Sequence, residues 1–237
     1  MDTLKTINVN TVTERYALQR QFLGLVGDSA PLFLVNGNHE QAAQSNLNGT
    51  PNNVALWAQL ARNRYYPQPA PDGFYTGDAQ PVEHIGSLRD YYAWTWGDAL
   101  FVVLDPYWHS SVPVDNALGG DGKRSDMWDI TLGDAQYQWF RNTLENSDAR
   151  YKFVFAHHVN GTGRGGIELA GDYEWGGKGK NGAWEFTRMR PGWELPIHQL
   201  MAKTGVTIFF QGHDHLFDRQ ELDGVIYQTL PEPANPV

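Results

Sequence analysis

Three short polar segments each follow a run of apolar residues, and all three contain histidine. They read GNHE at 37–40, AHH at 156–158 and GHDH at 212–215. A short apolar run followed by a turn is typical of a buried strand. Ligands of open α/β sheets bind at the carboxyl ends of the strands. If the three strands end at one rim, then Asn38, His157, His213 and His215 come together there.

These side chains are suited to binding a transition metal. Imidazole nitrogen binds Zn, Mn, Fe or Ni, and an amide oxygen adds a neutral ligand. The chain has no cysteine, so histidine, asparagine and carboxylates are the ligand types that remain. In an extended chain, residues two apart project to the same side. We therefore expect His213 and His215 to face one site while Asp214 faces away.

A structural role is the alternative for each histidine taken alone, because most histidines after a strand are simply hydrogen-bonded. Five of the eight histidines lie in the three polar segments, and their shared position after strands favours metal binding. His84 and His109 fall in expected loops and His198 in an expected helix, so a structural or solvated role is favoured for these three.

The elements that must position these residues can be predicted from hydrophobic spacing. We expect a hairpin around Gly97-Asp98, a long glycine- and tryptophan-rich loop from Asn160 to Pro191, and no regular structure after Leu230. The predicted helices are 12–27, 52–64, 134–146 and 194–203, and the predicted strands are 31–35, 151–155, 206–210 and 225–229. This alternation predicts an α/β class with a mixed sheet, in one domain spanning 1–237.

Composition excludes several classes of protein. The chain has 237 residues and a formal charge of −9, which argues against binding nucleic acid through phosphate contacts. No apolar run approaches the ~20 residues of a membrane-spanning helix, so no membrane partner is expected. The first residues lack the basic start and apolar stretch of a signal peptide. We expect a soluble protein whose compartment is unknown.

The motifs GNHE, FAHH and GHDH, in this order, resemble the later motifs of the calcineurin-like metallophosphoesterases, which include purple acid phosphatases and cyclic-nucleotide phosphodiesterases. The similarity runs from about Pro31 to Pro231. The resemblance implies a mixed β-sandwich flanked by helices, with a two-metal site of Zn, Mn or Fe. It implies that Asn38, His157 and His213 bind one metal and that His215 binds the other.

The resemblance also implies roles around the metals. His39 would face the substrate and stabilise the transition state or protonate the leaving oxygen, with Glu40 orienting it. In the mechanism that we predict from this, His158 or Arg164 contacts the phosphoryl oxygens. The loop 160–166 reads NGTGRGG, and Arg164 in it could bind a phosphate oxygen or remain a solvated loop residue. This loop matches the G-x-G-x-x-G pattern, but no helix is expected to follow, which disfavours dinucleotide binding.

The chain departs from the family pattern at its start. The family normally carries Asp-x-His and Gly-Asp-x-x-Asp motifs before the asparagine motif, and neither occurs before Asn38. The chain also ends soon after the strand predicted at 225–229. These departures predict a catalytic domain truncated at the N-terminus and the C-terminus, with one metal as an alternative to two. Unpaired sheet edges would favour association with further copies of the chain, as a homo-oligomer.

The function predicted first is metal-dependent hydrolysis of a small-molecule phosphomonoester or phosphodiester, with triesters as a further option. A catalytically impaired metal-binding fragment or scaffold is the alternative. A carbohydrate- or protein-binding module built on Trp175, Trp184 and Trp193 is a third possibility. The third is disfavoured because the polar clusters fall at strand ends while the tryptophans are scattered.

Overall fold

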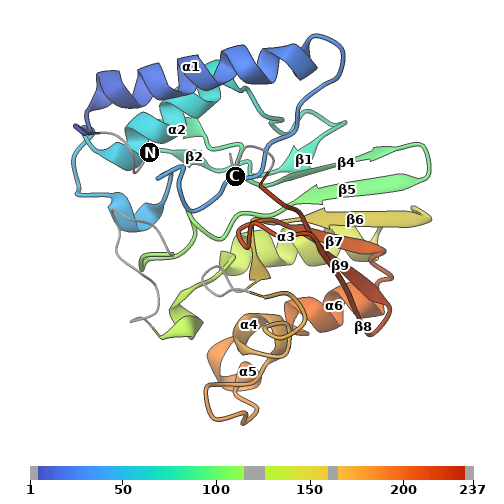
Figure 1. Ribbon diagram of the computed structural model, residues 1–237. Helices are drawn as coiled ribbons and strands as arrows, with labels where there is room; N and C mark the ends of the chain where they lie inside the picture. Colours follow the sequence, from blue (N-terminus) through green and yellow to red (C-terminus); the bar gives the residue numbers. More distant parts are fainter. Residues whose placement is uncertain (1–4, 115–125, 160–164, 233–237) are drawn as a thin grey trace.

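The computed structural model describes residues 5–114, 126–159 and 165–232, and its centre is a seven-stranded mixed sheet (Figure 1). In spatial order the strands are β1 (Thr76–Gly77), β4 (Tyr92–Trp96), β5 (Ala99–Val103), β6 (Tyr151–Phe155), β7 (Ile208–Gln211), β9 (Val225–Thr229) and β8 (Asp218–Leu222). The pairs β5–β6, β6–β7 and β7–β9 are parallel, and the other pairs are antiparallel. A small ribbon pairs β2 (Pro81–Val82) with β3 (Gly86–Ser87). The mixed α/β class predicted from the sequence is therefore confirmed.

Helices flank the sheet, and the four that were predicted are present. They are α1 (Val9–Gly27), α2 (Val54–Tyr65), α3 (Gly133–Glu145) and α6 (Ile197–Lys203), to which the structure adds α4 (Tyr173–Gly176), α5 (Phe186–Met189) and 3₁₀ turns at Gln44–Asn46 and Met127–Asp129. Asn8 and Asn53 cap α1 and α2 by accepting hydrogen bonds from the first backbone N–H groups of each helix. None of the helices in the described ranges is long and apolar enough to cross a bilayer.

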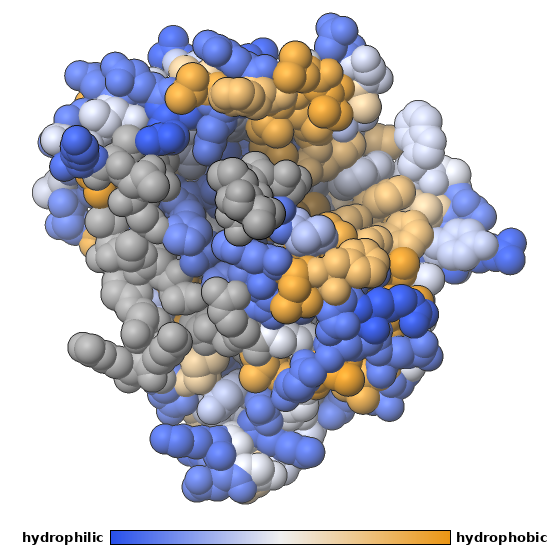
Figure 2. All heavy atoms as spheres, in the orientation of Figure 1, coloured by the Kyte–Doolittle hydropathy of each residue, from blue (hydrophilic) through white to orange (hydrophobic). Residues whose placement is uncertain are grey.

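The two faces of the sheet differ. One face is fully buried through Val102, Val154 and Phe209, and it packs with α3 and α6 in the main core. The other face carries half-buried aromatic side chains, and the register aligns them across neighbouring strands: Trp94, Phe101, Phe153, Phe155 and Phe210. Figure 2 shows hydrophobic surface on this side of the molecule. The helices α1 and α2 pack together through a second, smaller core near the β1 edge (Figure 1).

The strand predicted at 31–35 is wrong, because this segment pairs with no strand among the described residues. Its backbone is held by side chains instead. The N–H of Leu34 donates to Oε1 of Gln68 at 2.7 Å, and its carbonyl oxygen accepts from Nη2 of Arg62 at 2.8 Å and from the hydroxyl of Tyr92 at 3.1 Å. Polar backbone groups inside a protein need partners, and here side chains replace the missing ladder.

The prediction of a long loop from Asn160 to Pro191 is wrong for the described part of this segment. It contains α4 and α5, and Trp175 and Phe186 belong to the main core. Trp193 is also buried, and its ring stacks on Tyr137 with centroids 3.8 Å apart. Aromatic packing, not hydrophobic periodicity, therefore orders this segment. The structure also adds β8, whose sequence DRQEL is too polar to be read as a strand but pairs with β9 throughout its length.

Candidate metal centre

The carboxyl ends of β6 and β7 bring two of the predicted ligands together. These strands pair in parallel, so both end at the same rim of the sheet. His157 follows β6 and His213 follows β7, and Nε2 of His157 lies 3.2 Å from Nδ1 of His213. Oδ1 of Asn38 lies 2.8 Å from the same Nε2. The N–H of Gly212 donates to the carbonyl oxygen of His157 at 2.9 Å and so joins the two loops.

These three donors fit one transition-metal ion. In a tetrahedral zinc site with Zn–N bonds of about 2.0–2.1 Å, two ligand atoms lie roughly 3.3 Å apart, close to the separations around Nε2 of His157. Burial, together with the nearby His213, His39 and His215, lowers the pKa of His157 to about 3. The imidazole is therefore neutral at pH 7, the form that binds a metal. Within the described ranges, no group of three histidine, aspartate or glutamate side chains is arranged to hold a metal, and the set formed here includes an asparagine oxygen.

His215 makes a different contact from these three donors. Its side chain is 52% exposed, and Nδ1 lies 3.1 Å from Oε2 of Glu232. The extended backbone expected for residues 213–215 is wrong, while the expectation that the side chains of His213 and His215 face one site stays a prediction. Both residues have left-handed backbones, with φ of 69° and 56°, because the segment turns and does not continue β7. Asp214, between them, accepts a hydrogen bond from the N–H of Gly165 at 2.7 Å.

The turn that carries Asn38 is held tightly against the histidines. The carboxylate of Glu40 accepts a hydrogen bond from the N–H of Gly37. A Cβ at Gly37 would lie 2.8 Å from Oε2 of Glu40 and 3.1 Å from Cε1 of His157, so only glycine fits without movement. Burial raises the pKa of Glu40. His39 is exposed at the rim, and its predicted catalytic role, with Glu40 orienting it, stays a prediction.

Of the two residues predicted to bind substrate, His158 lies within the described residues. His158 is buried, and its ring packs against that of His213 with centroids 4.2 Å apart. Nδ1 of His158 lies 3.3 Å from the hydroxyl of Tyr107. The ring of His158 therefore packs against the ring of His213 and can help to orient it. Direct contact of His158 with substrate stays a prediction. Arg164 lies outside the described residues.

Asp105 is a site residue that sequence reasoning missed. It follows β5 and is fully buried, and its two carboxylate oxygens accept hydrogen bonds from Nδ2 of Asn36 and the N–H of Tyr107, both at 2.6 Å. Burial and the charge of Asp90 raise the pKa of Asp105 to about 7. Through Asn36, Asp105 fixes the chain two residues before Asn38. The signal was present, because FVVLD is another apolar run that ends in a polar residue.

The remaining histidines make contacts that suit structural roles. Nε2 of His109 lies 2.8 Å from Oδ2 of the buried Asp90. His198 bridges the hydroxyl of Tyr227 at 2.8 Å and the carboxylate of Asp223 at 3.0 Å. His84 is exposed and lies 3.8 Å from Glu83. The contacts of His109 and His198 hold neighbouring segments together, whereas that of His84 is with the adjacent residue.

The His109–Asp90 contact predicts a pH-dependent stability. Burial alone would lower the pKa of His109, but the hydrogen bond and charge of Asp90 outweigh it and raise the pKa. A raised histidine pKa stabilises the fold fully below the unfolded value of about 6.5 and loses that contribution as pH rises through the folded value. We expect His109→Gln to cost about 1.5–3 kcal/mol of unfolding free energy at pH 6 and less at pH 9, in urea titrations. A cost that stays constant or grows with pH would contradict this.

Comparison with known proteins adds no relative. No protein-family model matches the chain, and no curated protein matches it at a significant level.

Proposed function

We propose that the protein is a metal-dependent hydrolase of small-molecule phosphoesters, with a catalytic domain of the calcineurin-like metallophosphoesterase type. The convergence of Asn38, His157 and His213 carries this proposal. Two imidazoles and an amide oxygen leave coordination positions open, which is characteristic of catalytic metal sites. The two-layer sandwich belongs to the same proposal.

A bound divalent Zn, Mn or Fe would polarise a phosphoryl oxygen and lower the pKa of a water molecule toward ~7. The chain's own residues prepare the site for this. Burial keeps His157 neutral, and the Glu40–Gly37 hydrogen bond fixes the turn before Asn38. His39, exposed at the rim, is the group proposed to donate a proton to the leaving oxygen.

His215 is the proposed ligand of a second metal, although one metal remains the alternative. Histidines that bind metals usually donate their other ring N–H to a carboxylate, which orients the ring. Glu232 is in place to do this for His215, at 3.1 Å from Nδ1. Because the net charge of −9 repels anionic substrates, attraction must come from the bound cation and nearby groups. A homo-oligomer and no contact with nucleic acid or membrane are part of the proposal.

A chelation experiment tests the proposed function. Aryl phosphate monoesters, diesters and triesters are assayed after chelation and after adding back Zn, Mn or Fe. We expect activity to disappear on chelation, to return with metal, and to be lost in His213→Ala but retained in His84→Asn at an exposed position. Activity that survives chelation would overturn the metal mechanism. Activity absent with every substrate and metal would favour the metal-binding scaffold.

A further inference from the structure

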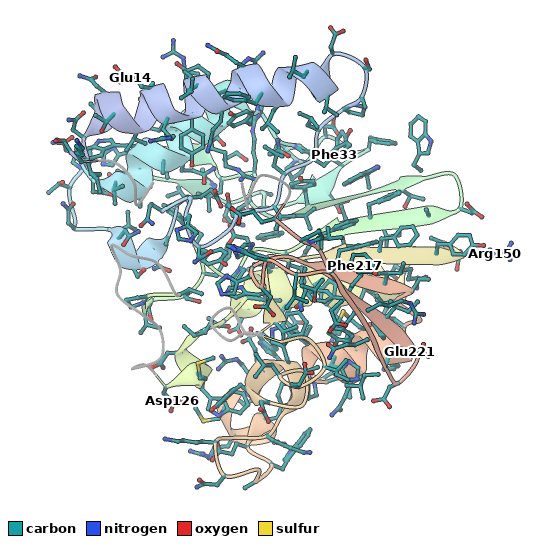
Figure 3. The ribbon with its side chains drawn as sticks, in the orientation of Figure 1. Glu14, Phe33, Asp126, Arg150, Phe217 and Glu221 are labelled. Atoms are coloured by element: carbon teal, nitrogen blue, oxygen red, sulfur yellow. The ribbon has the colours of Figure 1, made fainter. Side chains whose placement is uncertain are left out.

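Three exposed apolar side chains lie next to the predicted metal loop. Leu216, Phe217 and Leu230 are 47%, 71% and 45% exposed, and we call them the rim patch. Single exposed apolar residues are ordinary, but a cluster beside polar groups indicates a binding surface. Figure 3 labels Phe217 over the sheet, and Figure 2 shows hydrophobic surface in the same area.

The strand register brings the rim patch together. Asp218 of β8 pairs with Thr229 of β9 in the antiparallel ladder, so the next residues outward, Phe217 and Leu230, lie across from each other. The N–H of Leu230 donates to the carbonyl oxygen of Gln211 at 2.8 Å. Gln211 ends β7 and is separated from His213 by a single glycine. The rim patch therefore borders the loop that carries His213.

A second apolar surface lies on the half-buried face of the sheet. Phe155 of β6 and Phe210 of β7 are register partners, and their rings stack with centroids 4.9 Å apart. Phe155 precedes His157 by two residues, and Phe210 precedes His213 by three. Apolar side chains thus both precede and follow the histidine segments along the chain.

We infer that the rim patch binds the carbon part of the leaving group, so that the preferred substrates are phosphoesters of alkyl or aryl alcohols. This inference rests on the proposed function. A phosphoryl group held at Asn38, His157 and His213 leaves its ester substituent at the rim, where Leu216, Phe217 and Leu230 offer apolar surface. Esters of glycerol or a sugar would place hydroxyl groups on this surface and lose hydrogen bonds to water.

Binding of n-alkyl phosphonates, from ethyl to hexyl, tests the inference without relying on turnover. Calorimetry on the zinc-loaded protein should show Kd falling about twofold per added methylene, roughly half the effect expected for complete burial in free-energy terms. In Phe217→Ser and Leu230→Ser the dependence on chain length should vanish, while ethylphosphonate binds as before. Trp96→Ser is the matched control, because Trp96 is 73% exposed at the opposite end of the sheet.

The outcomes separate the inference from the proposed function. If ethylphosphonate binds but chain length has no effect, the role of the rim patch is overturned and the phosphoesterase proposal survives. The role of the rim patch is also overturned if Phe217→Ser leaves the chain-length effect intact. If Phe217→Ser instead converts a dimer to a monomer with that effect unchanged, the patch joins copies of the chain and the inference fails. If no phosphonate binds, the proposed function itself fails.

Discussion

Replacing His157 by alanine is expected to weaken zinc binding at least about 100-fold. Even residues that only orient a ligand change metal affinity by 10–100-fold, and His157 is the central donor of its set. Its Nε2 lies within 3.2 Å of both His213 and Asn38, so its loss separates the two remaining donors. Competition with a chromophoric chelator measures the change, and circular dichroism verifies that the variant is folded.

His215→Ala provides the informative comparison. This residue is half exposed and paired with Glu232, and it is not one of the three converging donors. We expect its replacement to change affinity for the first zinc ion by less than about tenfold. His84→Asn, at an exposed position, should leave zinc affinity unchanged. Equal losses for His157→Ala and His215→Ala would show that the three-donor set is not the main site.

Gly176→Ala is expected to lower the free energy of unfolding by about 3 kcal/mol or more, at the upper end of what overpacking costs. A Cβ at Gly176 would lie 1.9 Å from the carbonyl carbon of Gly171 and 2.2 Å from its Cα. These are backbone atoms, so no side-chain rotation relieves the clash. The segment must move apart, and that movement disturbs Trp175, which packs on Phe209 in the main core. Urea denaturation measures the loss.

Gly171, the other residue in this close contact, provides a matched control. A Cβ at Gly171 meets no atom within 4 Å, so Gly171→Ala should change stability by less than about 1 kcal/mol. Equal effects of the two substitutions would show that the close approach of the two backbones does not limit stability here.

Local sequence signals were sufficient for much of the fold, and their failures have identifiable causes. Apolar runs located the strands at 151–155 and 225–229, and α1 and α2 carry asparagine caps that local chemistry explains. The run at 31–35 has the same composition but forms no strand, because a strand needs a neighbour and composition cannot supply one. At β8, in contrast, a strand is present that the sequence did not predict. Its residues Arg219 and Glu221 are exposed and polar, so the segment lacks the apolar run by which strands were recognised, although it pairs with β9.

The candidate site was predictable in its residues but not in its geometry. The motif positions were sufficient to select Asn38, His157 and His213, which the structure brings together. The left-handed backbones of His213 and His215 were not predictable, because no local rule places two non-glycine residues there. Asp105 holds the segment before Asn38 through its hydrogen bond with Asn36, which is 69 positions away in the sequence. Such a contact arises only from the tertiary fold.

The side-chain attachment of the segment around Leu34 has a consequence for chain topology. Asn38 belongs to this segment and not to any rung of the main sheet, whereas His157 directly follows a central strand. The two residues are 119 positions apart in the sequence. A cation bound by both would act as a cross-link that closes this long loop and restricts the unfolded chain, and clips that close long loops gain the most from this effect in theory. Its binding would then tie the segment that carries Asn38 to the sheet, so that metal binding and folding are coupled.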